Sequence, residues 1–378
     1  MIYPILKAVV GIILLLGLPL LGAWWVGKPI ALYLHFPPQP MRLNLPEFSW
    51  PVFLLYLALE IPLYGFLIGI VRRCRRPRLQ PHLFPAWGWG ALVWLFISWY
   101  LAWVRPTWLG EMADFTFTPL WLGYIAVVNA LCQWRCGTCL LVRRPGFTLG
   151  LFPVSAAFWW YFEYLNRFVG NWQYLGAENI TAWQYLWRAT LPFSTVLPAV
   201  VSTIALLNTF WGPAKGLPSL QLPHARLWIW AGLILAGGGL IGIGYWPMGF
   251  FPLLWLAPLL LVAGLQVLSK QKSYFSPLRQ GRWEILALPM LAGLICGFFW
   301  EMWNYLSFPK WVYTVPFVSQ FKVFEMPLLG YAGYLPFGLE CALVVDWWEK
   351  QLQKLRLVKD LPSACASMAP SKNLRGQL

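Results

Sequence analysis

The chain has 378 residues, of which 59% are hydrophobic and only 11% are charged. A soluble domain of this size carries about a quarter charged residues, so the composition excludes an ordinary soluble fold and indicates a membrane protein. The net charge of +15 would favour a nucleic-acid partner, but the basic residues cluster between apolar runs, as topology determinants do. We therefore expect no nucleic-acid binding.

Apolar runs of about 20 residues recur along the chain, and this length matches the hydrocarbon thickness of a bilayer. They predict an all-α, polytopic helical membrane protein with about ten transmembrane helices. The first run lacks a small-residue cleavage site, so we expect it to be an anchor rather than a signal peptide. The predicted spans lie near residues 4–26, 50–71, 84–104, 118–138, 147–168, 190–211, 227–246, 250–269, 284–306 and 327–348.

The connecting segments alternate between the two sides of the membrane. Those on one side, counted together with both terminal segments, hold roughly three times as many basic residues as those on the other. Because basic segments stay on the cytoplasmic side of a membrane, we expect both termini in the cytoplasm. Residues 350–378 form an expected basic cytoplasmic tail. The short connecting segments favour a bacterial inner membrane.

Two distant segments share one pattern, "FWWYFEYLNRFVGNWQYLG" from residue 158 and "GFFWEMWNYLSFPKWVYTVP" from residue 297. Each contains Glu-x-x-Asn and then Trp-x-Tyr, and further along the chain each is followed by a Leu-Pro-Phe, at residues 191–193 and 335–337, at the entry to the next span. The order and spacing predict a parallel repeat of two four-helix units, residues 81–215 and 216–349. Two further N-terminal helices would occupy residues 1–80. Chance matching is the alternative, since the chain has 27 Trp.

Glu163 with Asn166, and Glu301 with Asn304, are the candidate catalytic pairs. Residues three apart share one helix face, so each Glu and Asn would project together near the outer end of a span. An ionisable residue at that depth indicates a functional site. Glu301 would be the leading acid or base, Asn304 would orient it or the substrate, and the other pair would be its pseudo-symmetric partner. Alternatively, both pairs only cross-link helices.

The aromatic residues around these pairs would form the walls of a substrate pocket, because flat rings stabilise a cationic centre. An interfacial aromatic belt is the alternative. The candidate substrate-binding residues are Trp172, Tyr174, Trp300, Trp303, Trp311 and Tyr313. Glu340 lies inside the last span, where the first unit has Val196 at the matching place. It would tune or share the proton, or else be a buried, hydrogen-bonded acid.

Cys132, Cys136 and Cys139 have the C-x3-C-x2-C spacing that can hold an iron–sulfur cluster. They straddle the end of a predicted span, and the chain has no soluble domain for a cofactor. Reduced or lipidated interfacial thiols are therefore the preferred interpretation. The three histidines are scattered over both sides. We expect no metal and no cofactor.

The leading functional hypothesis is an integral membrane enzyme that performs acid–base chemistry on a membrane lipid or isoprenoid near the outer face. Protonation, isomerisation, cyclisation and group transfer all fit positioned carboxyl groups. The alternatives are a proton-coupled or facilitative secondary transporter, with carboxylates in a cavity between the repeats, and a non-enzymatic membrane assembly partner. The sequence identifies no protein partner.

Overall fold

Long apolar segments form helices because a helix satisfies its backbone hydrogen bonds internally, as a lipid environment requires. The computed structural model describes residues 2–38, 46–74, 79–177, 180–221, 224–269 and 273–354. The predicted tail lies outside these residues from position 355 onward, and so do positions 75–78 and 270–272 of the basic connecting segments.

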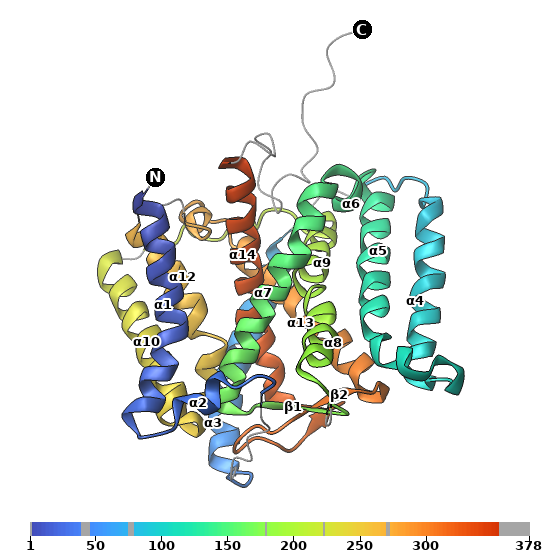
Figure 1. The fold of residues 1–378 in the computed structure, drawn as a ribbon. Coiled ribbons are helices and arrows are strands. Elements are labelled where there is room, and N and C mark those ends of the chain that lie inside the picture. Colours follow the sequence, from blue (N-terminus) through green and yellow to red (C-terminus); the bar gives the residue numbers. More distant parts are fainter. Residues whose placement is uncertain are drawn as a thin grey trace.

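The first half of the described chain forms helices that run between the two ends of one bundle (Figure 1). Its elements are α1 (Ile2–Trp25), α2 (Ile30–Leu34), α3 (Trp50–Arg73), α4 (Ala86–Val104), the 3-10 helix η1 (Thr107–Phe115), α5 (Phe117–Cys136), α6 (Leu140–Arg143), α7 (Pro145–Val169), the strand β1 (Trp172–Leu175), α8 (Ala182–Phe193) and α9 (Val196–Phe210). The span predicted to start at residue 190 begins earlier, because Thr181 and Gln184 form a capping box at the start of α8.

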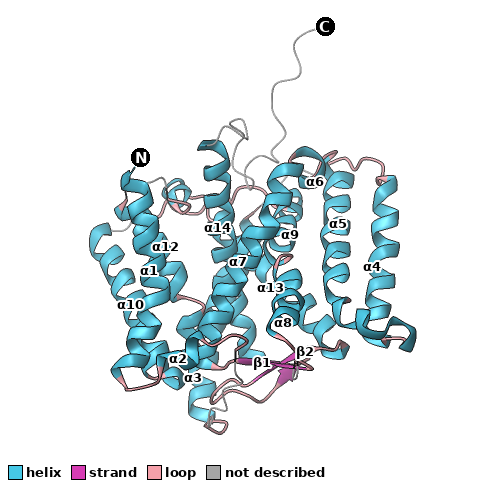
Figure 2. Cartoon of the chain, viewed as in Figure 1, coloured by secondary structure: helices cyan, strands magenta, loops and turns pink. Residues whose placement is uncertain are grey.

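The second half adds helices and three short strands (Figure 2). Its elements are α10 (Ala225–Tyr245), α11 (Pro247–Phe250), η2 (Phe251–Leu254), α12 (Ala257–Leu268), η3 (Ser276–Gln280), α13 (Glu284–Leu306), β2 (Lys310–Tyr313), β3 (Lys322–Val323), β4 (Met326–Pro327), η4 (Leu328–Gly333) and α14 (Tyr334–Lys354). The strands gather at one end of the bundle, which we call the strand end.

Within the described ranges, six helical stretches are long and apolar enough to cross a membrane. They are α3, α4, α8 with α9, α10, α13, and η4 with α14. Two bent pairs, η1 with α5 at 66° and α11–η2 with α12 at 55°, bring the number to eight if each pair is counted as one span. The chain is therefore an all-helical integral membrane protein. The first predicted span corresponds to α1, in which the stretch Val9–Trp25 is apolar, and a total of ten stays a prediction.

The outward faces of the peripheral helices are apolar. On α3, the side chains of Leu54, Leu55 and Leu59 are 54%, 58% and 62% exposed. Such faces suit lipid, whereas a soluble protein rarely exposes an apolar surface of this extent.

The start of α1 and the end of α14 both lie at the end of the bundle opposite the strands (Figure 1).

The helices α13 and α14 approach closely because glycines lie at their crossing. A Cβ atom on Gly293 would collide with the carbonyl oxygen of Tyr334, and one on Gly338 would collide with that of Pro289. Small residues permit this backbone approach in membrane helices. The contact fixes the start of α14 against the first half of α13. It therefore positions Tyr334 beside the Glu301 helix.

The two aromatic segments of the predicted repeat pair with each other. The strands β1 and β2 are antiparallel, with Trp172 opposite Tyr313 and Tyr174 opposite Trp311. The sequence pattern predicted two similar loops but not their pairing. This pairing joins the segment after α7 to the segment after α13 across more than 130 residues of sequence.

Candidate functional site

The two predicted asparagines make the same hydrogen bonds. Asn166 Nδ2 donates to the carbonyl oxygen of Trp172 at 2.8 Å, and Asn166 Oδ1 accepts from the Trp172 N–H at 3.3 Å. Asn304 makes the same two bonds to the backbone of Trp311, at 2.7 and 2.9 Å. Each amide therefore holds an aromatic strand against the helix before it. This geometry makes the asparagines positioning residues for the strands.

Glu163 accepts hydrogen bonds from the strand that Asn166 holds. Its Oε1 atom accepts from Trp172 Nε1 at 2.9 Å and from the Tyr174 hydroxyl at 2.5 Å. Trp159 Nε1, one turn earlier on α7, is 3.3 Å from the same oxygen. The residue is only 3% exposed. Three aromatic donors therefore converge on one buried carboxyl oxygen.

Glu301 has an equivalent environment with different donors. Its Oε1 atom accepts from the hydroxyls of Tyr313 and Tyr334, both at 2.7 Å. Trp311 Nε1 donates to the Tyr313 oxygen at 3.0 Å and so extends the network. Glu301 is fully buried, and its Oε2 atom has no hydrogen-bond partner within the described residues. One oxygen of this carboxyl group can thus carry a proton.

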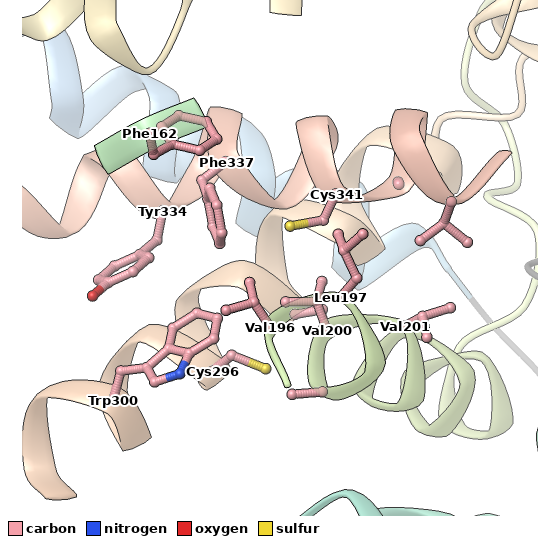
Figure 3. Close-up of a cluster of buried hydrophobic side chains, with 14 of the residues drawn as sticks. Phe162, Val196, Leu197, Val200, Val201, Cys296, Trp300, Tyr334, Phe337 and Cys341 are labelled. Atoms are coloured by element: carbon pink, nitrogen blue, oxygen red, sulfur yellow. The ribbon is translucent and has the colours of Figure 1, made fainter. Parts of the chain in front are cut away.

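Aromatic rings connect the two glutamate environments. The ring centroids of Trp159 and Trp300 are 6.4 Å apart, and those of Trp300 and Tyr334 are 6.1 Å apart. Figure 3 shows the Trp300 side chain on α13 near the side chains of Tyr334 and Phe337, both on α14. Together with the β1–β2 pairing, these contacts bring both predicted Glu-x-x-Asn pairs into one assembly.

A cavity of about 530 Å³ lies against this assembly. Thirteen of its lining residues are aromatic, and they include Trp159, Trp172, Tyr174, Trp255, Trp300, Trp311, Tyr313 and Tyr334. The two glutamates lie behind this wall. Within the described residues, they are connected to the cavity only through the phenol and indole groups that hydrogen-bond to them. Polar side chains on the wall include Glu60, Asp114, Asn171 and Arg188.

The strand tyrosines are hydrogen-bond donors in this arrangement. Burial, followed by the adjacent Glu163 carboxyl, raises the pKa of Tyr174 well above its ordinary value. Burial, followed by Glu301, does the same to the pKa of Tyr313. Both phenols therefore keep their protons at neutral pH and direct them to the carboxyl oxygens.

Two further predicted site residues, Trp303 and Glu340, neither line the cavity nor hydrogen-bond to Glu163 or Glu301 within the described residues. Trp303 is 1% exposed and packs on Trp121, with ring centroids 5.1 Å apart, rather than on the cavity. Glu340 is 3% exposed on α14 and faces Tyr161 and the backbone N–H of Leu259. Neither of its oxygens makes a side-chain hydrogen bond within the described residues. It forms a separate buried group between α7, α12 and α14.

The cysteines of the C-x3-C-x2-C segment are free thiols in this structure. Cys132 and Cys139 are buried, and Cys136 is partly buried. Across the part of the chain that the structure describes, no group of three His, Cys, Asp or Glu side chains has the arrangement of a metal site.

Sequence reasoning missed several groups of the site. Trp159 precedes Glu163 by four residues, so helical spacing places it on the same face. Tyr334 directly precedes the second Leu-Pro-Phe. The repeat pattern therefore identified this part of the chain, but not Tyr334 itself. Trp255 and Arg188 carried no signal, because only the tertiary fold brings them to the cavity.

Comparisons with protein-family models, with curated proteins and with solved structures find no significant match to this chain. We therefore infer a function from the fold and from the geometry of the side chains.

Proposed function

We propose that this chain is an integral membrane enzyme that performs acid–base chemistry on a lipid or isoprenoid bound in the aromatic cavity. One observation carries the proposal: phenols that line the cavity are hydrogen-bonded to two buried carboxyl groups. A cavity of about 530 Å³ falls in the range of roughly 300–1,000 Å³ that is usual for small-molecule sites. Its apolar walls suit an apolar substrate.

The chemistry runs through a tyrosine. When Glu301 acts as the base, the Tyr334 oxygen takes a proton from a substrate carbon while its own proton passes to Glu301 Oε1. When Glu301 acts as the acid, the proton moves in the reverse direction, and the phenol protonates the substrate. The 2.7 Å hydrogen bond serves both directions. Tyr313 offers a second route to the same carboxyl oxygen.

The aromatic wall would stabilise the charge that such a step develops. Protonating a carbon–carbon double bond creates a cationic centre, and the faces of Trp and Tyr rings attract cations. Trp300 and Trp159 present adjacent rings beside the two carboxyl networks. The buried carboxyl groups behind the wall add electrostatic stabilisation, because charges act more strongly in a buried, low-dielectric environment than in water.

The parallel repeat belongs to this proposal. Asn166 and Asn304 make matching bonds, and the β1–β2 register is symmetric about the pair Gln173–Val312. A two-fold axis along the membrane normal relates parallel repeats and would produce such a register. We therefore retain the units 81–215 and 216–349, the ten spans, and the strand end as the outer face of a bacterial inner membrane.

Lipid turnover tests the proposed activity. Purified protein in nonionic detergent is incubated with total lipid from the source organism, and lipids are compared by mass spectrometry before and after incubation. We expect at least one lipid to be converted by the wild type. Glu301→Gln should lower the rate by about 100-fold or more, in line with loss of acid–base catalysis. The control, Glu111→Gln, changes an exposed carboxyl of η1 and should retain the rate. Equal rates for both variants would contradict the proposal.

A second function, proton-coupled transport, is favoured by the surroundings of Glu340. This buried carboxyl faces the first turn of α12, just after the 55° bend in the α11–η2–α12 pair. Transporters place ionisable residues beside broken helices. In proteoliposomes with an imposed potential, this function predicts proton uptake that Glu340→Gln abolishes. Absence of protein-dependent proton uptake would contradict it.

A further inference from the structure

We infer that the cavity binds an amphiphile with an oxyanion headgroup, and that Arg188 is the residue that binds this headgroup. The inference rests on the proposed function, because the same cavity would take the substrate, and it adds the chemical class of that substrate.

An ion cluster with excess positive charge lies at the α8 side of the cavity. Arg188 Nη1 is 2.8 Å from Asp114 Oδ2, and Arg105 Nη2 is 3.1 Å from Asp114 Oδ1. Two guanidinium groups thus share one carboxylate, and the cluster carries one net positive charge. Asp114 and Arg188 both line the cavity. A second oxyanion would complete the charge balance.

Arg188 has donors left for such a group. A guanidinium has five N–H donors, and the ion pair with Asp114 engages Nη1 of Arg188. Among the described residues, its other side-chain interaction is with the Phe115 ring, whose centroid is 5.9 Å from the guanidinium carbon. The side chain is 18% exposed. Arginine binds phosphate and carboxylate groups through two parallel N–H donors, which Nε and Nη2 of Arg188 can supply.

The rest of the cavity dictates how an amphiphile would lie. From Arg188 on α8, the cavity extends to Tyr56 and Glu60 on α3, past the tryptophan rings. Besides Arg188 and Asp114, the acidic or basic side chain that lines the cavity, among the described residues, is the carboxyl group of Glu60. The Glu60 carboxyl disfavours an anionic head at that end of the cavity, whereas the cluster at Arg188 favours one. The apolar tail would therefore lie along the aromatic wall, where the tyrosines face it.

Binding of defined probes tests the inference. Hexadecyl phosphate, hexadecanol and inorganic phosphate are titrated onto the purified full-length protein in nonionic detergent, and occupancy is measured by native mass spectrometry. We expect hexadecyl phosphate to bind roughly 10- to 100-fold more tightly than hexadecanol, as charge-assisted hydrogen bonds imply. Inorganic phosphate alone should not compete at equal concentration. Equal affinity for the phosphate and the alcohol would overturn the inference, and competition by inorganic phosphate would indicate a site for the free ion.

Two variants separate headgroup binding from a purely structural ion pair. Arg188→Gln should lower the affinity for hexadecyl phosphate to that for hexadecanol, while hexadecanol binding stays unchanged. Asp114→Asn should raise the affinity for hexadecyl phosphate, because it removes the competing carboxylate. A structural ion pair predicts a loss for both variants, which would overturn the inference. Arg226→Gln, an exposed residue at the start of α10, is the control.

The result of the binding experiment does not depend on the result of the lipid-turnover experiment. Glu301→Gln should bind hexadecyl phosphate like the wild type, since the carboxyl lies behind the wall. Normal binding without lipid turnover would refute the proposed enzyme and leave this inference standing. Turnover of a neutral lipid without preference for the alkyl phosphate would refute the inference alone.

Discussion

Gln173 and Val312 face each other at the centre of the β1–β2 pairing. On one side of this pair Trp172 lies opposite Tyr313, and on the other side Tyr174 lies opposite Trp311. The Trp and the Tyr of both strands therefore line the same cavity, and the Trp of each strand lies opposite the Tyr of the other. Each tyrosine then bonds the glutamate of the helix that precedes its own strand.

A cross-link can test this pairing. Directly opposed residues in an antiparallel pair have Cα atoms about 4.5–5.5 Å apart, which is within the range of a disulfide. We expect Gln173→Cys combined with Val312→Cys to form an intramolecular disulfide under mild oxidation. Peptide mass spectrometry would detect it, and Gln173→Cys alone is the control. Failure of the double variant to cross-link, at normal expression, would contradict the register.

The asparagine bonds predict a loss of stability. Asn304→Ala leaves the N–H and carbonyl of Trp311 without their partners, and each unsatisfied buried group costs about 1–3 kcal/mol. We expect the free energy of unfolding in detergent to fall by at least that amount, and Asn166→Ala to behave alike. Gln280→Ala changes an exposed amide and should have an effect within about 0.5 kcal/mol. An unchanged stability for Asn304→Ala would show that these bonds do not hold the strand.

Gly297 provides the space that the Tyr334 ring occupies. A Cβ atom at this position would collide with the ring, so Gly297→Ala should displace Tyr334 from Glu301. We expect this variant to lose lipid turnover more than stability, because the helix itself tolerates alanine well. Gly232→Ala, on α10 with open space around it, is the matched control. Turnover at the wild-type rate in Gly297→Ala would argue against a catalytic role for the Tyr334–Glu301 bond.

The sequence predicted the membrane class and the two Glu-x-x-Asn pairs, because both follow from local composition and helical spacing. It could not predict that Asn166 and Asn304 bind backbone, since this depends on the path of the chain after each helix. The pairing of β1 with β2 and the ion pair between Asp114 and Arg188 are also non-local. Trp303 was predicted to line the cavity because it is close to Glu301 in the sequence. Its side chain packs elsewhere, because the fold rather than sequence proximity decides which residues line a cavity.

Solvent deuterium exchange tests the central claim most directly, namely that a carboxyl-linked phenol moves a proton to or from a lipid carbon. The wild type, Tyr334→Phe, Glu301→Gln and Glu111→Gln are incubated with lipid in D₂O, and carbon-bound deuterium in the lipid is measured by mass spectrometry. The account predicts deuterium incorporation by the wild type and by Glu111→Gln, and a loss of about 100-fold or more in the other two. Incorporation by Glu301→Gln at the wild-type rate, or lipid conversion by the wild type without any carbon-bound deuterium, would contradict it.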